Sequence, residues 1–313
     1  YGGLAMAGLQ IMNLRYSRGD ESEADRLGLR YMSRTGYDAD AMIGVFQMLG
    51  AVSGGSGRLP EWQLTHPLPE NREAAIRQEI EATGVSTIDR DEYPDMIDGI
   101  VWGANPREGY FEGSRFLHPE LAFELTFPAG WNTVNQRTAV GAVSPAEDAI
   151  VVVTLAEEAD DPNAALRDFL AQEGISGGQP SQSVSGAVTT ARSPFRAATE
   201  DGSISGEVAF VRYGELTYRI LGYGAPGQWS AYSGAVGATI SSFAAVTDPG
   251  VLNVQPLRLR IVRLPQATSL TSWVAANPQP VELEVLARLN RVSPAEVISA
   301  GTGSKVVEGP PVG

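Results

Sequence analysis

Two acidic residues, Glu21 and Asp25, lie four positions apart in the stretch DESEADRLGLRYMSRTGYDADAM, whose apolar spacing predicts a helix. Residues four positions apart share one face of an α-helix. Two carboxylates beside Gly28 make a poor core face, but they suit a site where one carboxylate binds a cation and the other orients a neighbouring group. The alternative is that both acids decorate the solvated face of an amphipathic helix, since acidic first turns are common.

The chain has two histidines, His66 and His118, and no cysteine, which excludes disulfides and thiolate metal sites. His66 precedes a proline in THPLPENR, so its backbone is biased away from the α region and its ring projects from an extended segment before a helix. It is either a metal ligand or a structural, exposed histidine. His118, in FLHPELAF, lies in a strand-like run, and we assign it no functional role.

Three helices are predicted before residue 84. The first follows the N-cap Ser17 and ends at Gly36, and Asp38 then caps a second helix that runs through Leu49. Residues 50–57, rich in glycine and serine, are predicted to form a flexible loop. A third helix begins at about Glu70.

The rest of the chain predicts a multidomain α+β protein. A connector rich in Asp, Gly and Pro covers residues 85–110, and short alternating runs over 111–246 predict an antiparallel sheet with helices at 162–174 and 228–243. Residues 252–313 have the order β-α-α-β. We expect Trp131 and Trp229 to be core or rim aromatics.

Composition limits the classes of partner. Asp and Glu number 37 against 23 Lys and Arg, giving a formal charge of -14, which argues against nucleic acid or an anionic membrane surface as the main partner. No stretch approaches the ~20 apolar residues of a membrane-spanning helix. The chain begins at Tyr1 without a signal peptide, so we expect it to be truncated or processed at that end.

Three motifs in order resemble the C-terminal half of the catalytic domain of the HtpX and CAAX-prenyl-protease family of zinc metallopeptidases, in particular its soluble periplasmic members of the BepA type. They are E-x-x-A-D at 21–25, Gly-Tyr-Asp at 36–38, and Thr-His-Pro at 65–67 followed by Arg72. The resemblance covers roughly residues 10–82. It implies that residues 1–84 are the helical C-terminal part of a zincin-type domain.

The resemblance also implies roles for individual residues. Glu21 would be the third protein ligand of a zinc ion, and Asp25 would hold a histidine of the HExxH helix by its other ring nitrogen. His66 would be a latch that can approach the zinc and block its water position, and Arg72 would help to position the loop of His66. No HExxH occurs in the 313 residues, so no catalytic residue is assigned within them. The two histidine ligands and the general base are expected upstream of Tyr1, and this chain alone is expected to be inactive.

The last 60 residues resemble a degenerate LysM-like module, with Leu289-Asn290 and the closing KVV run in the expected places. The first loop departs from the pattern, because Ala267-Thr268-Ser269-Leu270 stands where GDTL is usual. LysM modules often bind peptidoglycan glycans. The altered loop leaves glycan binding and a structural or docking role as alternatives.

These features together predict a zinc metalloendopeptidase of cell-envelope protein quality control, in the periplasm or another extracytoplasmic location, with or without membrane association. Its substrates would be unfolded or misassembled proteins, and its C-terminal domains would contact peptidoglycan or envelope proteins. One alternative is a non-catalytic binding or chaperone-like protein that keeps the peptidase scaffold. Another is a processed fragment that associates again with its N-terminal half.

Overall fold

The computed structural model describes residues 18–53, 69–83, 93–156, 160–199 and 202–310. It confirms a multidomain α+β protein: every strand pairing among these residues is antiparallel, and they form nine α-helices. The chain divides into two compact units. One contains residues 104–256, here called the central domain, and the other contains residues 14–103 and 257–313.

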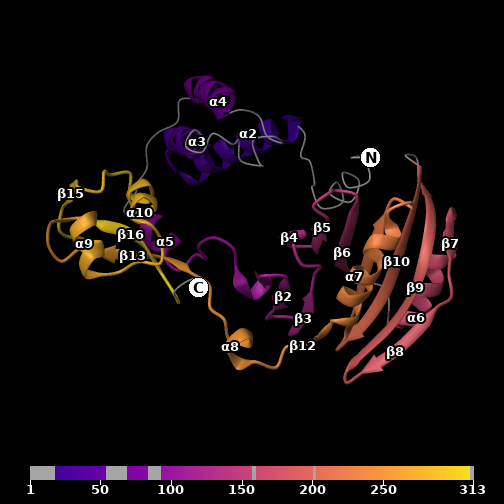
Figure 1. The fold of residues 1–313 in the computed structure, drawn as a ribbon. Coiled ribbons are helices and arrows are strands. Elements are labelled where there is room, and N and C mark those ends of the chain that lie inside the picture. Colours follow the sequence, from indigo (N-terminus) through magenta and orange to yellow (C-terminus); the bar gives the residue numbers. More distant parts are fainter. Residues whose placement is uncertain (1–17, 54–68, 84–92, 157–159, 200–201, 311–313) are drawn as a thin grey trace. The chain divides into compact units, whose positions relative to one another are not determined.

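The central domain is built on a large antiparallel sheet in the order β4-β5-β6-β11-β10-β9-β7, with β8 also paired to β9 (Figure 1). Its strands are β4 (Asn132–Gln136), β5 (Ala139–Val143), β6 (Ala149–Leu155), β7 (Ile175–Gly177), β8 (Ser181–Ser185), β9 (Val188–Thr199), β10 (Gly202–Tyr213) and β11 (Leu216–Gly224). A smaller sheet has the order β1-β2-β3-β12, from β1 (Tyr110–Glu112), β2 (Arg115–His118), β3 (Phe123–Thr126) and β12 (Ala244–Ala245).

Both faces of the large sheet are covered. Helix α7 (Trp229–Ser241) and the small sheet bury one face, whose core includes Val151 and Val153. Helix α6 (Pro162–Leu170) buries the other face, whose core includes Ile150 and Val152 (Figure 1). Because β6 is covered on both sides, its sequence is a continuous apolar run instead of an alternating one.

Pro194 and Gly222 are each suited to their positions in the large sheet. Pro194 lies in β9 between the part paired to β8 and the part paired to β7, where a missing N–H interrupts no ladder. Gly222 lies under α7, where a Cβ atom would meet Val236 Cγ1 at 2.2 Å. Trp131 and Trp229 are partly buried against the core on the α7 side, as the sequence predicted.

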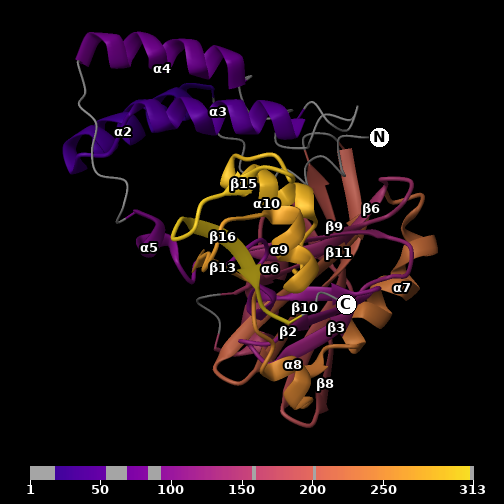
Figure 2. The ribbon, with the colours of Figure 1, turned by 90° about the vertical axis from the view of Figure 1, so that its left-hand side faces the viewer.

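The C-terminal module, residues 257–310, pairs β13 (Arg258–Arg263) with β16 (Gly303–Glu308) (Figure 2). It also pairs β14 (Thr268–Ser269) with β15 (Val297–Ile298). Two helices predicted from the sequence lie between the long strands, α9 (Leu270–Ala276) and α10 (Leu283–Asn290). The buried core of the module includes Leu264, Leu270, Leu286 and Val307. A short helix, α8 (Pro249–Leu252), precedes the module at the end of the central domain.

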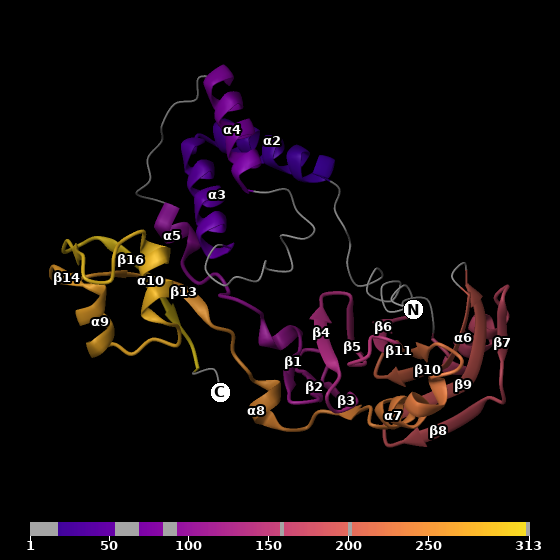
Figure 3. The ribbon, with the colours of Figure 1, turned by 45° about the horizontal axis from the view of Figure 1, so that its top comes forward.

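Helices α2 (Arg18–Thr35), α3 (Asp40–Ser53) and α4 (Pro69–Thr83) form a helical segment (Figure 3). They enclose a small core of Leu29, Ala39, Ile43, Phe46 and Ile76. Gly36 has φ +80°, as expected for the residue that ends α2. The predicted loop at 50–57 is wrong in its first half, because α3 continues through Ser53; a single Gly50 costs a helix only about 1 kcal/mol.

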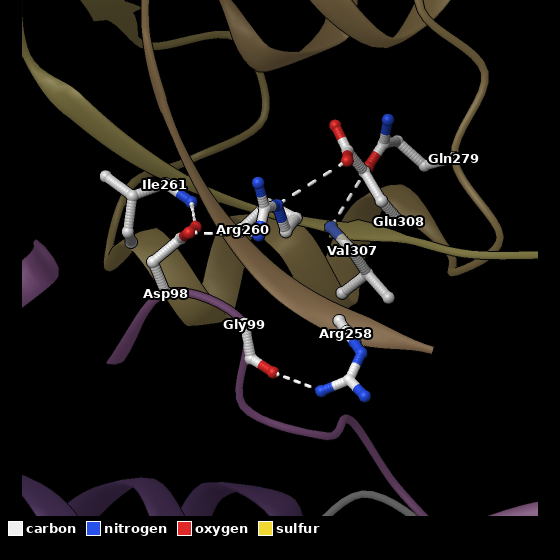
Figure 4. Close-up of polar contacts among 8 residues, drawn as sticks. All are labelled: Asp98, Gly99, Arg258, Arg260, Ile261, Gln279, Val307 and Glu308. Atoms are coloured by element: carbon white, nitrogen blue, oxygen red, sulfur yellow. Dashed lines mark hydrogen bonds and ion pairs between the residues drawn. The ribbon is translucent and has the colours of Figure 1, made fainter. Parts of the chain in front are cut away.

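The segment before the central domain joins the edge of β13. After α5 (Tyr93–Ile97), the N–H groups of Gly99 and Trp102 donate to the carbonyls of Leu259 and Leu257, both at 2.7 Å. Asp98 accepts from the N–H of Ile261 at 2.8 Å and pairs with Arg260 at 3.0 Å (Figure 4). The chain therefore adds a strand-like edge to the module before it enters the central domain through the short 3-10 helix η2 (Pro106–Glu108).

The central domain is consequently an insertion. The chain leaves this edge after Trp102 and returns at Leu257, and these two residues are hydrogen-bonded to each other. In the part of the chain that the structure describes, no helix is long and apolar enough to cross a membrane.

Candidate functional site

The residues singled out from the sequence lie on two helices of the helical segment. Glu21 and Asp25 belong to α2, with Glu21 one turn before Asp25, and Arg72 belongs to α4. His66 lies outside the described residues. The sequence separation of 47 residues between Asp25 and Arg72 is closed by the packing of α4 against α2 and α3.

Asp25 and Arg72 are in direct contact. The Nε–H group of Arg72 donates to Oδ2 of Asp25 at 2.7 Å, and its Nη2–H group donates to Oδ1 at 2.6 Å. The two parallel bonds match the planar guanidinium to the planar carboxylate, which is the strongest form of such a pair. Both side chains are largely removed from water, with 9% of the Asp25 and 17% of the Arg72 side chain exposed.

An aromatic ring from the third helix completes this arrangement. The guanidinium carbon of Arg72 lies 5.0 Å from the ring centroid of Phe46, within the range of a cation–π contact. Phe46 is itself buried in the core of the segment. Arg72 thus links α2, α3 and α4, and the position of Asp25 is fixed by contacts from both of the other helices.

The burial of Asp25 excludes, for this residue, the interpretation that it decorates a solvated helix face. Asp25 is 7% exposed, whereas Glu23, two positions earlier, is exposed. Asp25 is therefore not part of a solvated acidic face, and Glu23 is. A carboxylate has room for about four hydrogen bonds, and the two from Arg72 leave acceptor sites for another donor, such as an imidazole N–H.

The described residues do not by themselves complete a metal centre. Within them, no three His, Asp or Glu side chains are grouped so that they could hold a metal ion. A carboxylate such as Glu21 and an imidazole such as His66 are both donors that zinc accepts. What the structure adds is a buried, oriented carboxylate at Asp25, one helical turn from Glu21.

Sequence reasoning missed two residues of the central domain. His118 and Tyr218 line a cavity beside the small sheet, although His118 had been assigned no role. A histidine at the end of a predicted strand and directly before a proline was the available signal for His118. Nothing in its own sequence context marks Tyr218, because its surroundings depend on a strand and a turn nearly 100 residues earlier.

The N-terminal segment of the chain matches a known protein family. Residues 2–80 match the model of "Peptidase family M48". The beta-barrel assembly-enhancing protease of Yersinia pestis is 40% identical over 67 residues, which are 21% of this chain and 14% of that protein. The protein of the same name from Escherichia coli K12 is 39% identical over 72 residues, or 23% of this chain and 15% of that protein. The resemblance stated from the motifs is confirmed for this segment, although the match spans only about a seventh of these relatives.

Solved structures are similar to parts of the chain at low identity. The cyanobacterial PsbP protein (CyanoP) of Synechocystis has a TM-score of 0.34 and 14% identity, covering 44% of this chain and 95% of that one. LpqN of Mycobacterium tuberculosis, described as involved in cell envelope biogenesis, has a TM-score of 0.30 and 13% identity, covering 44% of this chain and 87% of that one.

Proposed function

We propose that this chain is the part of a zinc metalloendopeptidase of cell-envelope protein quality control that follows the HExxH helix. The observation that carries the proposal is the M48-type sequence of residues 2–80, within which Asp25 is buried and held by Arg72. A buried, fixed carboxylate is what the orientation of a metal-ligating histidine requires. The supporting relatives are named beta-barrel assembly-enhancing proteases.

In this proposal Glu21 is a metal ligand and Asp25 orients a histidine supplied by the preceding helix. When bound, zinc would lower the pKa of its water and polarise the scissile carbonyl. Asp25 accepts the second ring N–H of that histidine with the lone pairs that Arg72 leaves free, which fixes the ring orientation. Arg72 keeps the carboxylate from rotating, and His66 serves as the latch that the resemblance implies.

The remaining parts are assigned by the same proposal. Residues 1–84 are the end of the zincin-type catalytic domain, residues 85–110 the connector, and residues 111–246 and 252–313 the domains that recruit substrates or dock the enzyme. The last of these is LysM-like, with peptidoglycan or envelope proteins as its ligands. The substrates are unfolded or misassembled exported proteins, and the location is the periplasm or another extracytoplasmic site, with or without membrane association.

The test is the substitution Glu21→Gln in the complete protein that contains the upstream helix. A neutral amide is a poor zinc ligand, so bound zinc, measured by mass spectrometry of the metal, should fall well below one per chain, and proteolysis of an unfolded casein should be lost. Glu23→Gln, on the exposed side of the same helix, is the matched control and should retain both. Stoichiometric zinc in Glu21→Gln would remove Glu21 from the site.

A second substitution tests the latch. His66→Ala should leave zinc content unchanged and increase the rate of casein cleavage, because nothing then competes with water for the open position. Lower activity with unchanged folding would place His66 in the catalytic machinery instead. Absence of zinc from the complete wild-type protein would favour the non-catalytic, chaperone-like alternative.

A further inference from the structure

The central domain contains a cavity of ≈ 580 Å³ on the face of the large sheet that the small sheet covers. This volume lies within the range of ~300–1,000 Å³ typical of ligand sites. Aromatic and aliphatic side chains from both sheets form its wall, among them Phe116, Phe123, Val140 and Val153. We call it the Tyr218 pocket, after the residue at the junction of the two sheets.

Tyr218 supplies a hydrogen-bond donor that has no partner among the residues that the structure describes. Only 2% of the residue is exposed, and its hydroxyl makes no hydrogen bond with any described residue. The enclosed, unpartnered side-chain atoms among the described residues are those of Thr154, Thr239 and Ser304, and the Tyr218 hydroxyl is not one of them. The residue itself lines the cavity. The phenol of a tyrosine already keeps its proton at neutral pH, and burial, reinforced by Tyr213, raises the pKa of Tyr218 further, to about 12.

His118 supplies a second neutral donor. Its Nδ1 atom accepts a hydrogen bond from the N–H of Leu121 at 3.2 Å, which places the proton of the neutral ring on Nε2. Burial lowers the pKa of His118, so the neutral form prevails at pH 7. The ring stacks on Phe123 with centroids 5.3 Å apart, and Phe123 in turn contacts Tyr218. Both residues therefore contact the same aromatic ring.

The charged residues at the mouth do not select an ionic ligand. Glu108, Glu120 and Arg137 are exposed and carry charges of both signs, and Glu108 already accepts a hydrogen bond from the amide of Asn105. The interior combines apolar walls with uncharged donors. Such a lining matches a neutral acceptor, such as a carbonyl, attached to an apolar group.

An edge strand beside the pocket favours a polypeptide over a small molecule. β4 ends the large sheet and has β5 as its only partner among the described strands. Its last two residues, Asn135 and Gln136, and the following turn line the cavity. An extended chain that pairs with an edge strand gains main-chain hydrogen bonds and directs every second side chain to one face.

We propose that the Tyr218 pocket binds a large apolar side chain, together with an adjoining backbone carbonyl, of an extended polypeptide. The proposal deepens the proposed function and rests on it for the substrate class, since unfolded proteins expose such segments. It assigns their recognition to the central domain, separately from the chain region that carries Glu21.

The experiment measures binding of fluorescein-labelled peptides to the 313-residue chain by fluorescence anisotropy. One ten-residue peptide of Gly, Ser and Thr carries a central Phe, and its counterpart carries Ser at that position. The Phe peptide should bind at least about tenfold more tightly, since removing such an apolar side chain from water favours binding. Equal binding of the two peptides would overturn the proposal.

Variants identify the pocket as the site. Tyr218→Phe keeps the ring and should weaken the Phe peptide about fivefold, as expected for loss of one neutral hydrogen bond. Leu155→Ser, at the pocket rim, should also weaken it, whereas Leu216→Ser should not, because Leu216 is a similarly exposed leucine outside the lining. Wild-type affinity in both Tyr218→Phe and Leu155→Ser would overturn the assignment.

Two further outcomes keep this inference distinct from its rivals. If N-acetylphenylalanine methylamide alone binds as tightly as the peptide, the pocket is a small-molecule site and the polypeptide proposal fails. The binding assay requires neither zinc nor the upstream helix. Peptide binding with no zinc in the complete protein would overturn the proposed function and leave the pocket assignment standing. Zinc-dependent proteolysis without peptide binding would overturn the pocket assignment and leave the proposed function standing.

Discussion

Arg72 holds the Asp25 carboxylate by two hydrogen bonds, of 2.7 and 2.6 Å, while its guanidinium lies over the ring of Phe46. One side chain of α4 thereby fixes both α2 and α3. The hydrophobic core of this segment is small. The largely buried ion pair therefore contributes much to fixing how the three helices pack against one another. The same contact determines where a carboxylate stands beside Glu21, which links the packing of the segment to its proposed chemistry.

The first prediction concerns this pair. Arg72→Ala leaves a buried carboxylate without its cation and should destabilise the helical segment by about 2–4 kcal/mol. Hydrogen exchange of the amides in α2, α3 and α4 measures this locally. Arg77→Ala is the matched control, since its ion pair with Glu73 on the same helix is more exposed than the Asp25 pair, and it should change protection by at most about 0.5 kcal/mol. Equal effects of the two substitutions would show that the Asp25–Arg72 pair stabilises the segment no more than the Arg77–Glu73 pair does.

The sequence predicted many elements of the fold, because their signals are local. Gly36 and Asp38 mark the turn between α2 and α3, and the hairpin of β10 and β11 follows from two alternating runs around Gly214. Strands β8 and β9 were missed. β8 is polar and wholly exposed, and β9 contains Pro194, which is acceptable only because its partner strand changes there. The change from β8 to β7 as the partner of β9 depends on the tertiary fold, so the local sequence cannot predict it.

The second prediction concerns the contact between α7 and the sheet. Gly222→Ala would place a methyl group 2.2 Å from Val236 Cγ1, so α7 must move, and the central domain should lose about 1–3 kcal/mol of stability. Gly234→Ala, in α7 itself, meets nothing within 4 Å and should stabilise the helix by up to about 1 kcal/mol. Urea unfolding followed by tryptophan fluorescence compares the two. A neutral Gly222→Ala would mean that α7 is not packed as described.

The third prediction concerns pH. Because burial lowers the pKa of His118, the unfolded chain binds a proton at this site near pH 6.5 while the folded chain does not. The free energy of unfolding should therefore fall as the pH drops below 6.5, down to the lowered pKa. His118→Asn keeps an acceptor for the Leu121 N–H and removes the titration, so the loss between pH 7 and 5 should be smaller in the variant. Parallel pH profiles of wild type and variant would contradict this.

The candidate site was predictable only in part, for a similar reason. The order of its motifs identified Glu21, Asp25 and Arg72, but the sequence could not show that Asp25 and Arg72 are bonded to each other, since 47 residues separate them. The Tyr218 pocket was beyond sequence reasoning. Its donors come from β2 and β11, and the cavity that they line forms only when the two sheets pack together.

The fourth prediction concerns Asp98, which takes the place of a backbone carbonyl at the edge of β13. Asp98→Ala removes the acceptor of the Ile261 N–H and the partner of Arg260, and should destabilise the C-terminal module by about 1–2 kcal/mol. Asp95→Ala is the control, because its pair with Arg263 is 3.4 Å long and exposed on both sides. Amide exchange of Ile261 and its neighbours in β13 is the measurement, and equal protection in both variants would contradict the role of Asp98.

The fifth prediction follows from the insertion of the central domain. The N–H of Trp102 donates to the carbonyl of Leu257 at 2.7 Å, so the two ends of residues 104–256 leave the module side by side. Replacing these residues by a Gly-Ser linker of about four residues should leave the module folded, because the hydrogen bonds of Gly99, Trp102 and Leu259 need nothing from the central domain. The amide protection of β13 and β16 should match that of the full chain.

The inserted domain should also fold by itself. Residues 104–256 alone should retain their own thermal transition, since both faces of their large sheet are covered by elements of the same domain. Loss of protection in β13 after the replacement would show instead that the module depends on the inserted domain.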